Sequence, residues 1–253
     1  QDDAPYVTNI REAGMEVIYP DDPTFTRGHK TEAETIEQLS KCQAILAGGE
    51  HFTENVLAAL PDLRVIARCG VGYDRVDVDA ATRHGVAVTI TPTANHESVA
   101  EHAFSLMFAI AKSVMSSDRS MRTGDWNQNS TLPIRGQTLG ILGLGRIGRS
   151  VAVRATALGM KVMAYDAFPN ESFAQEHGVQ LVDLDTLLAQ SDYLTIHCPL
   201  NDDTQGLFNQ ETLAKMKSGS VLVNTARGPL VVEADLIDAI EAGHIYGAGL
   251  DVF

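Results

Sequence analysis

Short apolar runs alternate with amphipathic stretches along the whole sequence, and this rhythm restricts the possible folds more than any other feature. Residues 44–47, 63–67, 161–165 and 220–224 are examples of the apolar runs. Apolar runs of this length, separated by helical stretches, are typical of parallel strands and their crossover helices. The sequence therefore predicts an α/β protein with a doubly wound parallel sheet and a second, smaller parallel sheet.

The positions of the expected elements follow from the same periodicity. Strands are expected at residues 17–19, 44–47, 63–67, 86–89, 161–165, 193–197, 220–224 and 245–252, with another that begins at Thr138. Helices are expected at residues 53–60, 78–84, 98–116, 185–190, 210–216 and 233–241. A further helix should begin at Thr31, because Glu34 three residues later completes a capping-box pattern.

The pattern is interrupted at residues 91–95, Thr-Pro-Thr-Ala-Asn, and the interruption is typical of a linker. We expect one domain at residues 1–93 and a second at residues 94–253, with a hinge between them. The usual opening strand of the first domain would precede Gln1. The apolar ending Asp251-Val252-Phe253 resembles a buried strand, so truncation at both ends is expected.

The helix expected at residues 98–116 is apolar on most of its faces, which is more than one core-facing stripe requires. Two explanations stay open. The helix is buried in an interdomain or subunit contact, or it is the central core helix of a monomer. The expected assembly is a homodimer.

Charge and cysteine content restrict the partners and the compartment. The net charge is −14 without any cluster of lysine and arginine, which argues against nucleic acid and anionic membranes. Cys42, Cys69 and Cys198 form no CxxC pair and no zinc spacing, so neither a disulfide framework nor a metal site is expected. There is no apolar run of ~20 residues and no secretory signal, so the expected location is cytoplasmic.

The strongest motif is Gly143-Leu144-Gly145-Arg146-Ile147-Gly148, a GxGxxG pattern between an expected strand and an expected helix. Gly143 permits a tight turn, and Gly145 lets the backbone approach a pyrophosphate. Gly148 allows the helix to pack closely on the strand. The amides at the helix start then face the phosphates. This pattern predicts that the larger domain is a Rossmann domain that binds a dinucleotide.

Asp166 ends the next expected strand, 18 positions after Gly148. A carboxylate there accepts hydrogen bonds from the adenosine ribose and repels a 2′-phosphate. Residues 167–169, Ala-Phe-Pro, supply no arginine for such a phosphate. The expected cofactor is therefore NAD and not NADP.

Residues 216–228 form a second motif, in which a strand delivers Arg227 to the carboxyl edge of the sheet. Ligands of open α/β sheets bind at this edge. The planar guanidinium could hold a substrate carboxylate and polarise the adjacent 2-oxo group as hydride arrives. A lone arginine after a strand is more often a surface cation, and the order of the motifs favours the catalytic interpretation.

Taken together, these motifs resemble the D-2-hydroxyacid dehydrogenase family, and in particular its phosphoglycerate dehydrogenase-like members. The resemblance covers almost the whole chain. Besides the glycine turn and Asp166, it rests on four further segments, residues 68–74, 98–102, 197–200 and 224–228, and on the glycine-rich ending at residues 247–253. It implies a flavodoxin-like substrate domain beside the Rossmann domain, and hydride transfer between nicotinamide and a small 2-hydroxy or 2-oxo acid.

The resemblance also implies roles at matching positions. Arg146 and Ile147 would lie at the pyrophosphate, and Cys198 and Pro199 on the adenosine side of the cleft. Thr225, Ala226 and Arg227 would meet the nicotinamide half, while Asp251 would bind the carboxamide. In the smaller domain, the amides around Val71 and Gly72 would bind the substrate carboxylate, and Gly70 and Gly72 would allow an anion-binding nest.

The sequence departs from the family pattern in two respects. Family members use a histidine–glutamate pair as proton donor, and both residues are expected beyond Phe253. None of the eight histidines matches that position; His197 matches a cleft residue, while His96 and His102 are expected to pack or cap locally. Glu50 stands where phosphate-handling members carry cations, which would disfavour 3-phosphoglycerate and suit glyoxylate or hydroxypyruvate at least as well.

Two alternative functions stay open at this point. A non-catalytic NADH-binding regulator or scaffold on the same fold would keep the glycine turn and Asp166 without an acid/base. A relative with different chemistry, such as formate oxidation, is the other alternative. Arg227 and the Gly70–Gly72 turn favour an enzyme, because they serve a substrate.

Overall fold

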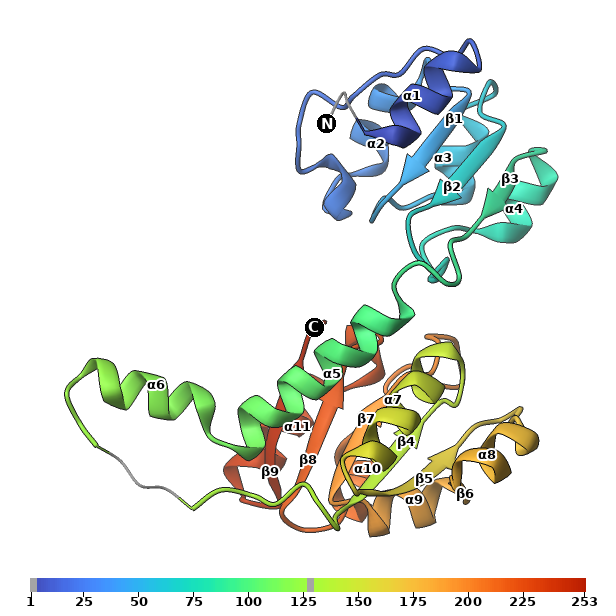
Figure 1. Ribbon diagram of the computed structural model, residues 1–253. Helices are drawn as coiled ribbons and strands as arrows, with labels where there is room; N and C mark the ends of the chain where they lie inside the picture. The colour runs from blue at the N-terminus through green and yellow to red at the C-terminus, as the bar shows by residue number, and fades with distance from the viewer. Residues whose placement is uncertain (1–3, 127–129) are drawn as a thin grey trace. The chain divides into compact units, whose positions relative to one another are not determined.

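The computed structural model describes residues 4–126 and 130–253, and the chain divides into two compact units at residues 1–91 and 92–253 (Figure 1). The division predicted after residue 93 falls close to this one. Within the described ranges, no helix has both the length and the apolar content needed to cross a membrane.

The first unit is built around a three-stranded parallel sheet in the order β1-β2-β3. Its elements in chain order are α1 (Pro5–Glu12), the 3-10 helix η1 (Phe25–Arg27), α2 (Glu32–Leu39), β1 (Ala44–Ala47), α3 (Glu54–Ala58), β2 (Val65–Arg68), α4 (Val78–Arg83) and β3 (Ala87–Thr89). The capping box predicted at Thr31 and Glu34 is confirmed, with the Glu34 amide donating to Thr31 Oγ1 at 3.3 Å.

The strand predicted at residues 17–19 is wrong, because this segment has no regular structure. Ile18 and Tyr19 are 53% and 41% exposed. In the sheet as described, β1 is hydrogen-bonded only to β2, and residues 17–19 pair with neither. An apolar triplet supplies side chains for burial, but a strand also requires a neighbour for its backbone hydrogen bonds.

The second unit contains a six-stranded, wholly parallel sheet in the order β6-β5-β4-β7-β8-β9. Its strands are β4 (Thr138–Leu142), β5 (Lys161–Tyr165), β6 (Gln180–Leu181), β7 (Tyr193–Ile196), β8 (Ser220–Asn224) and β9 (Ile245–Leu250). This order arises from two βαβαβ halves, β4 to β6 and β7 to β9, which meet where β4 pairs with β7. The unit therefore has the doubly wound fold that the sequence predicts. The short strand β6 was not predicted.

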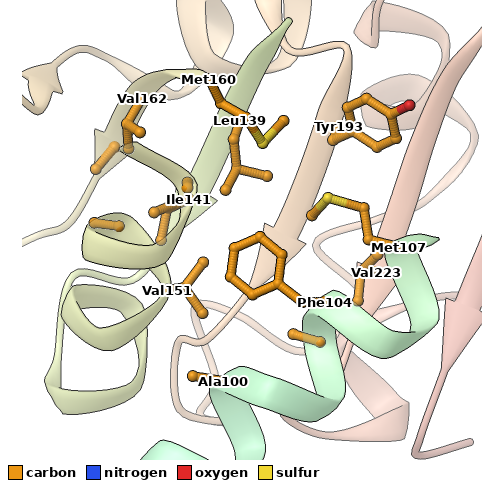
Figure 2. Packing of buried hydrophobic residues seen from close by; sticks show 14 of the residues in the cluster. Ala100, Phe104, Met107, Leu139, Ile141, Val151, Met160, Val162, Tyr193 and Val223 are labelled. Carbon is orange, nitrogen blue, oxygen red and sulfur yellow. The ribbon is translucent and has the colours of Figure 1, made fainter. Parts of the chain in front are cut away.

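Helices cover both faces of this sheet and form two apolar cores. They are α5 (His96–Ala111), α7 (Arg146–Ala157), α8 (Glu171–His177), α9 (Leu184–Gln190), α10 (Gln210–Lys215) and α11 (Glu233–Glu241), with the 3-10 helix η2 (Gly228–Leu230) after β8. The helix α6 (Val114–Arg122) follows α5 and belongs to neither core. One core lies under α5 and α7, where Phe104 of α5 faces Ile141 of β4, Val151 of α7 and Val223 of β8 (Figure 2). The other core lies under α9, α10 and α11.

The single long helix predicted at residues 98–116 is two helices, α5 and α6. Ser113 between them adopts a left-handed conformation with φ of 51°. The Leu132 amide donates to the Ala111 carbonyl at 2.8 Å, and Lys112 Nζ donates to the Leu132 carbonyl at 2.7 Å. The last turn of α5 is therefore bound by a later segment, which local helix periodicity does not encode.

The two helices differ in their burial. In α5, Ala100, Ala103, Phe104, Met107 and Ala111 are buried in the core of the second unit. Gly249 of β9 admits this helix, because a Cβ there would lie 2.8 Å from Leu106 Cβ. In α6, by contrast, no residue is buried. The apolar character of α5 is thus explained by the core of its own unit.

Candidate functional site

The glycine turn joins β4 to α7, and its three glycines have different surroundings. Gly143 has φ of 95°, and a Cβ there would lie 2.7 Å from the Cys198 amide nitrogen. A Cβ at Gly148 would collide with the Gly143 carbonyl. At Gly145, no atom lies within 4 Å of the Cβ position, so open space borders the backbone at the start of the helix.

The N-terminus of α7 faces this open space. Gly145 is the N-cap residue, and no side chain caps the helix. Gly145 and Arg146 are exposed, whereas Ile147 packs partly against the core. Unbonded amides and the positive end of the helix dipole therefore meet at an accessible glycine, which suits a pyrophosphate.

Asp166 directly follows β5 and reaches back to the glycine turn. Its Oδ2 accepts a hydrogen bond from the Leu144 amide at 2.6 Å, and its Oδ1 accepts one from the Phe168 amide at 2.8 Å. Each carboxylate oxygen has a further lone pair, so both can also accept from ribose hydroxyls. Asp166 therefore shapes the turn as well as offering acceptors, and the sequence indicated only the second property.

Cys198 and Pro199 follow β7, the strand beside β4. Burial, with Asp166 nearby, raises the pKa of the Cys198 thiol to about 11. The thiol is therefore protonated at neutral pH, and Cys198 is suited to line an apolar surface and unsuited to nucleophilic attack.

Thr225, Ala226 and Arg227 follow β8, in a turn that Asn224 organises. The Asn224 side chain accepts from the Ala226 amide at 3.0 Å and donates to the Arg227 carbonyl at 2.8 Å. Asn224 is 1% exposed and Thr225 8% exposed, while Arg227 is half-buried and donates from Nη1 to the Ala226 carbonyl at 2.7 Å. The guanidinium thus lies at the carboxyl edge of the sheet, the edge that also carries the glycine turn.

Asp251 follows β9, and its amide donates to the Asn224 carbonyl at 3.0 Å. Its Oδ1 lies 3.2 Å from Nε2 of His102, a residue of α5. The expectation that His102 packs or caps locally is therefore wrong, because its partner Asp251 follows β9 and is far from α5 in the sequence. His96 does act locally: its Nδ1 lies 3.0 Å from the Thr93 carbonyl oxygen. No local pattern could have shown the His102–Asp251 contact.

In the first unit, Val71 and Gly72 follow β2, and Arg68 Nε donates to the Gly72 carbonyl at 3.1 Å. Gly70 does not adopt a positive φ, so this glycine supplies no left-handed residue to the predicted anion-binding nest. Gly70 contributes open space instead, with no atom within 4 Å of its Cβ position.

Glu50 is 2% exposed, and neither of its carboxylate oxygens has a hydrogen-bond partner. Burial raises its pKa, and the nearby amides of Gly48 and Glu50 with the cations Arg68 and Arg75 offset part of this effect. Glu50 is therefore enclosed in the first unit, and the repulsion of a phosphorylated substrate by its carboxylate stays a prediction.

No group of three or more histidine, cysteine, aspartate or glutamate residues that could hold a metal ion occurs in the part of the chain that the structure describes. The residues around the glycine turn, in contrast, fit a dinucleotide. The open cradle at Gly145, the uncapped start of α7 and the acceptors of Asp166 lie together at one edge of a doubly wound sheet. Fold and site thus define a dinucleotide-binding α/β protein.

Comparisons with known proteins extend this conclusion. Residues 104–253 match the family model of the D-isomer specific 2-hydroxyacid dehydrogenase, NAD binding domain. D-3-phosphoglycerate dehydrogenase of Mycobacterium tuberculosis is 48% identical over 200 residues, which are 78% of this chain and 38% of that protein. Glyoxylate reductase of Korarchaeum cryptofilum is 40% identical over 225 residues, which are 86% of this chain and 68% of that protein.

Among solved structures, D-lactate dehydrogenase from Aquifex aeolicus, complexed with NAD and lactic acid, matches with a TM-score of 0.87 and 33% identity. The match covers 100% of this chain and 74% of that one. The chain belongs to the D-isomer specific 2-hydroxyacid dehydrogenase family, and its second unit contains the family's NAD-binding domain. It spans less than half the length of the D-3-phosphoglycerate dehydrogenases that it matches.

Proposed function

We propose that this protein is an NAD-dependent oxidoreductase that transfers a hydride between nicotinamide and a small 2-hydroxy or 2-oxo acid. The observation that carries the proposal is Arg227, a cation held at the same sheet edge as the glycine turn. A guanidinium there can bind the carboxylate of a 2-oxo acid beside the nicotinamide. The names of the relatives, which include a D-lactate dehydrogenase and a glyoxylate reductase, support this class of substrate.

The second unit would hold the cofactor with groups already in place. The glycine turn, Arg146 and Ile147 would bind the pyrophosphate, and Asp166 the ribose of the adenosine. Cys198 and Pro199 would line the adenosine side, and Thr225 and Ala226 the nicotinamide side. Asp251 would accept a hydrogen bond from the carboxamide and so fix the face that the ring presents. The bound nicotinamide supplies or accepts the hydride.

Arg227 would bind the substrate carboxylate and stabilise the negative charge that develops on the 2-oxygen. It cannot supply the proton, because a guanidinium does not deprotonate in proteins. The histidine–glutamate pair that the resemblance implies beyond Phe253 is the proton donor in this proposal. In the first unit, the amides of Val71 and Gly72 would contribute to carboxylate binding.

The substrate is proposed to be of the 3-phosphoglycerate, hydroxypyruvate or glyoxylate type. Glu50, enclosed in the first unit, is the reason to compare a phosphorylated acid directly with unphosphorylated ones. The names of the relatives include both D-3-phosphoglycerate dehydrogenase and glyoxylate reductase, so both kinds of acid belong in the first assays.

We also propose that the protein is a homodimer and that α6 contacts the second copy. Around this helix, Val114, Met115, Met121 and Trp126 are 49%, 67%, 61% and 77% exposed. Apolar side chains gathered on an element without buried residues are typical of an interaction surface.

The three free cysteines are consistent with the proposed reducing, cytoplasmic location.

The assay that tests the function uses the full natural protein with NADH and a panel of glyoxylate, hydroxypyruvate and the phosphorylated 2-oxo acid related to 3-phosphoglycerate. NADH oxidation with at least one of these acids is the expected result. Tight NADH binding without turnover of any acid would instead support the non-catalytic regulator. Reduction of NAD by formate alone would identify different chemistry on the same fold.

A further inference from the structure

The imidazole of His197 lies between two threonine hydroxyls at the carboxyl edge of the large sheet. Its Nε2 lies 2.9 Å from Oγ1 of Thr195 on β7, and its Nδ1 lies 3.5 Å from Oγ1 of Thr225, just after β8. The first distance is a normal hydrogen bond and the second is a long one. One ring thus connects two neighbouring strands at the place where the candidate nicotinamide site begins.

The ring is uncharged at any pH at which the protein is expected to work. Burial lowers the pKa of His197 to about 3, and no charged side chain contributes to this change. A neutral imidazole has one N–H donor and one acceptor nitrogen. It can therefore accept from one hydroxyl while it donates to the other, which gives the chain of hydrogen bonds a direction.

Of the two hydroxyls that the ring connects, that of Thr195 is closed to ligands. Thr195 is fully buried, at 0% exposure, whereas Thr225 is 8% exposed. The Thr195 hydroxyl therefore cannot contact a cofactor itself, and its hydrogen bond to His197 is a route by which it can act on the cofactor site. The backbone of Thr225 is held separately, by the Asn224 side chain described above. The ring therefore acts on the hydroxyl of Thr225 and leaves its backbone position to Asn224.

We propose that Thr195, His197 and Thr225 form a hydrogen-bonded relay in which His197 is a positioning residue that orients the Thr225 hydroxyl towards the bound nicotinamide half of the cofactor. The relay rests on the proposed function, because it needs Thr225 to contact the cofactor. A hydroxyl that rotates freely must be ordered when the cofactor binds, and the relay orders it beforehand. His197 does not exchange protons with the substrate.

The test measures NADH affinity by fluorescence titration in Thr195→Val, which keeps the side-chain shape and removes the hydroxyl. Thr195→Ser, which keeps the hydroxyl, is the matched control. We expect Thr195→Val to weaken NADH binding roughly three- to tenfold, the effect of one neutral hydrogen bond, and Thr195→Ser to bind almost normally. Unfolding temperatures of both variants separate this effect from a loss of structure.

A double-mutant cycle then distinguishes a relay from mere packing. In the double variant Thr195→Val with Thr225→Val, the loss of NADH affinity should be no larger than in Thr225→Val alone. Thr225→Val already removes the hydroxyl that the relay orients, so Thr195 has nothing left to act on. If the two losses multiply, the relay is wrong. If Thr195→Val does not fold, His197→Gln takes its place, since its amide can bond Thr195 but offers no second ring nitrogen to Thr225.

The pH profile is an independent readout. Since the ring stays neutral, His197 should not contribute to the pH dependence of NADH affinity. A step in the wild-type profile near the ordinary histidine pKa that is missing in His197→Gln is therefore not expected. Such a step would overturn the relay as described. Failure of the wild-type protein to bind NADH at all would instead contradict the proposed function, so the two failures are distinguishable.

Discussion

At the scale of single residues, the site combines groups whose environments the fold has already fixed. Asn224 holds the turn that carries Arg227, and the Leu144 amide holds one oxygen of Asp166. Residues held in this way can be tested by substitutions that change one property and preserve the backbone.

Arg227→Lys keeps the positive charge and removes the planar pair of donors. We expect kcat/KM for the 2-oxo acid to fall by about 10²-fold, because a lysine cannot hold a carboxylate and a developing oxyanion in the same geometry. NADH affinity should change less than about twofold. Steady-state kinetics and an NADH titration check both values, and undiminished activity would remove Arg227 from the mechanism.

Asp166→Ala should relax the preference for NAD over NADP by about tenfold or more, because a carboxylate no longer repels the 2′-phosphate. The alanine also removes the acceptor of the Leu144 amide, so Asp166→Asn is the control that keeps an acceptor and loses the charge. We expect both variants to shift in the same direction. An unchanged ratio in both would contradict the ribose assignment.

Glu50→Gln should stabilise the first unit at neutral pH, because burial disfavours the charged carboxylate and the amide carries no charge. Burial raises the folded-state pKa of Glu50, so the wild-type protein is most stable below the unfolded-state pKa and loses this contribution as pH rises through the folded-state pKa. The difference between variant and wild type should therefore vanish in acid. Denaturant unfolding at several pH values measures it.

At the scale of elements, α6 stands out because its apolar side chains have no core to enter. Val114 and Met121 are seven residues apart and so share one face of the helix, while Ser116 lies on the opposite face. Met121→Glu should shift the protein from dimer to monomer by at least about tenfold in dissociation constant. Ser116→Glu adds the same charge on the opposite face and should leave the dissociation constant of the dimer unchanged. Sedimentation analysis of both variants measures this constant.

Which elements the sequence predicts depends on where their determinants lie. The glycine turn, β8 and α11 are encoded by local residues, and all three occur where the periodicity predicts them. The break at Ser113 depends on the later residue Leu132, and the His102–Asp251 contact joins α5 to the end of β9. Burial of Glu50 likewise depends on the loops around it, which no local pattern encodes.

At the scale of the whole molecule, two units with separate cores share one chain. The candidate cofactor groups all belong to the second unit. NADH at about 100 times its dissociation constant should therefore raise the unfolding free energy of that unit by about 2.7 kcal/mol and leave the first unit unchanged. Calorimetry with and without NADH should show one transition that moves and one that does not.

The cofactor edge is assembled from segments that follow β4, β5, β7, β8 and β9, and therefore from residues spread between Gly143 and Asp251. On the ribosome, the first unit can acquire its core while the rest of the chain is still being made. The cofactor edge has no such early stage, because β9 must dock on β8 before Asp251 reaches its place. Capture of the nucleotide through Asp251 therefore requires that synthesis has passed β9.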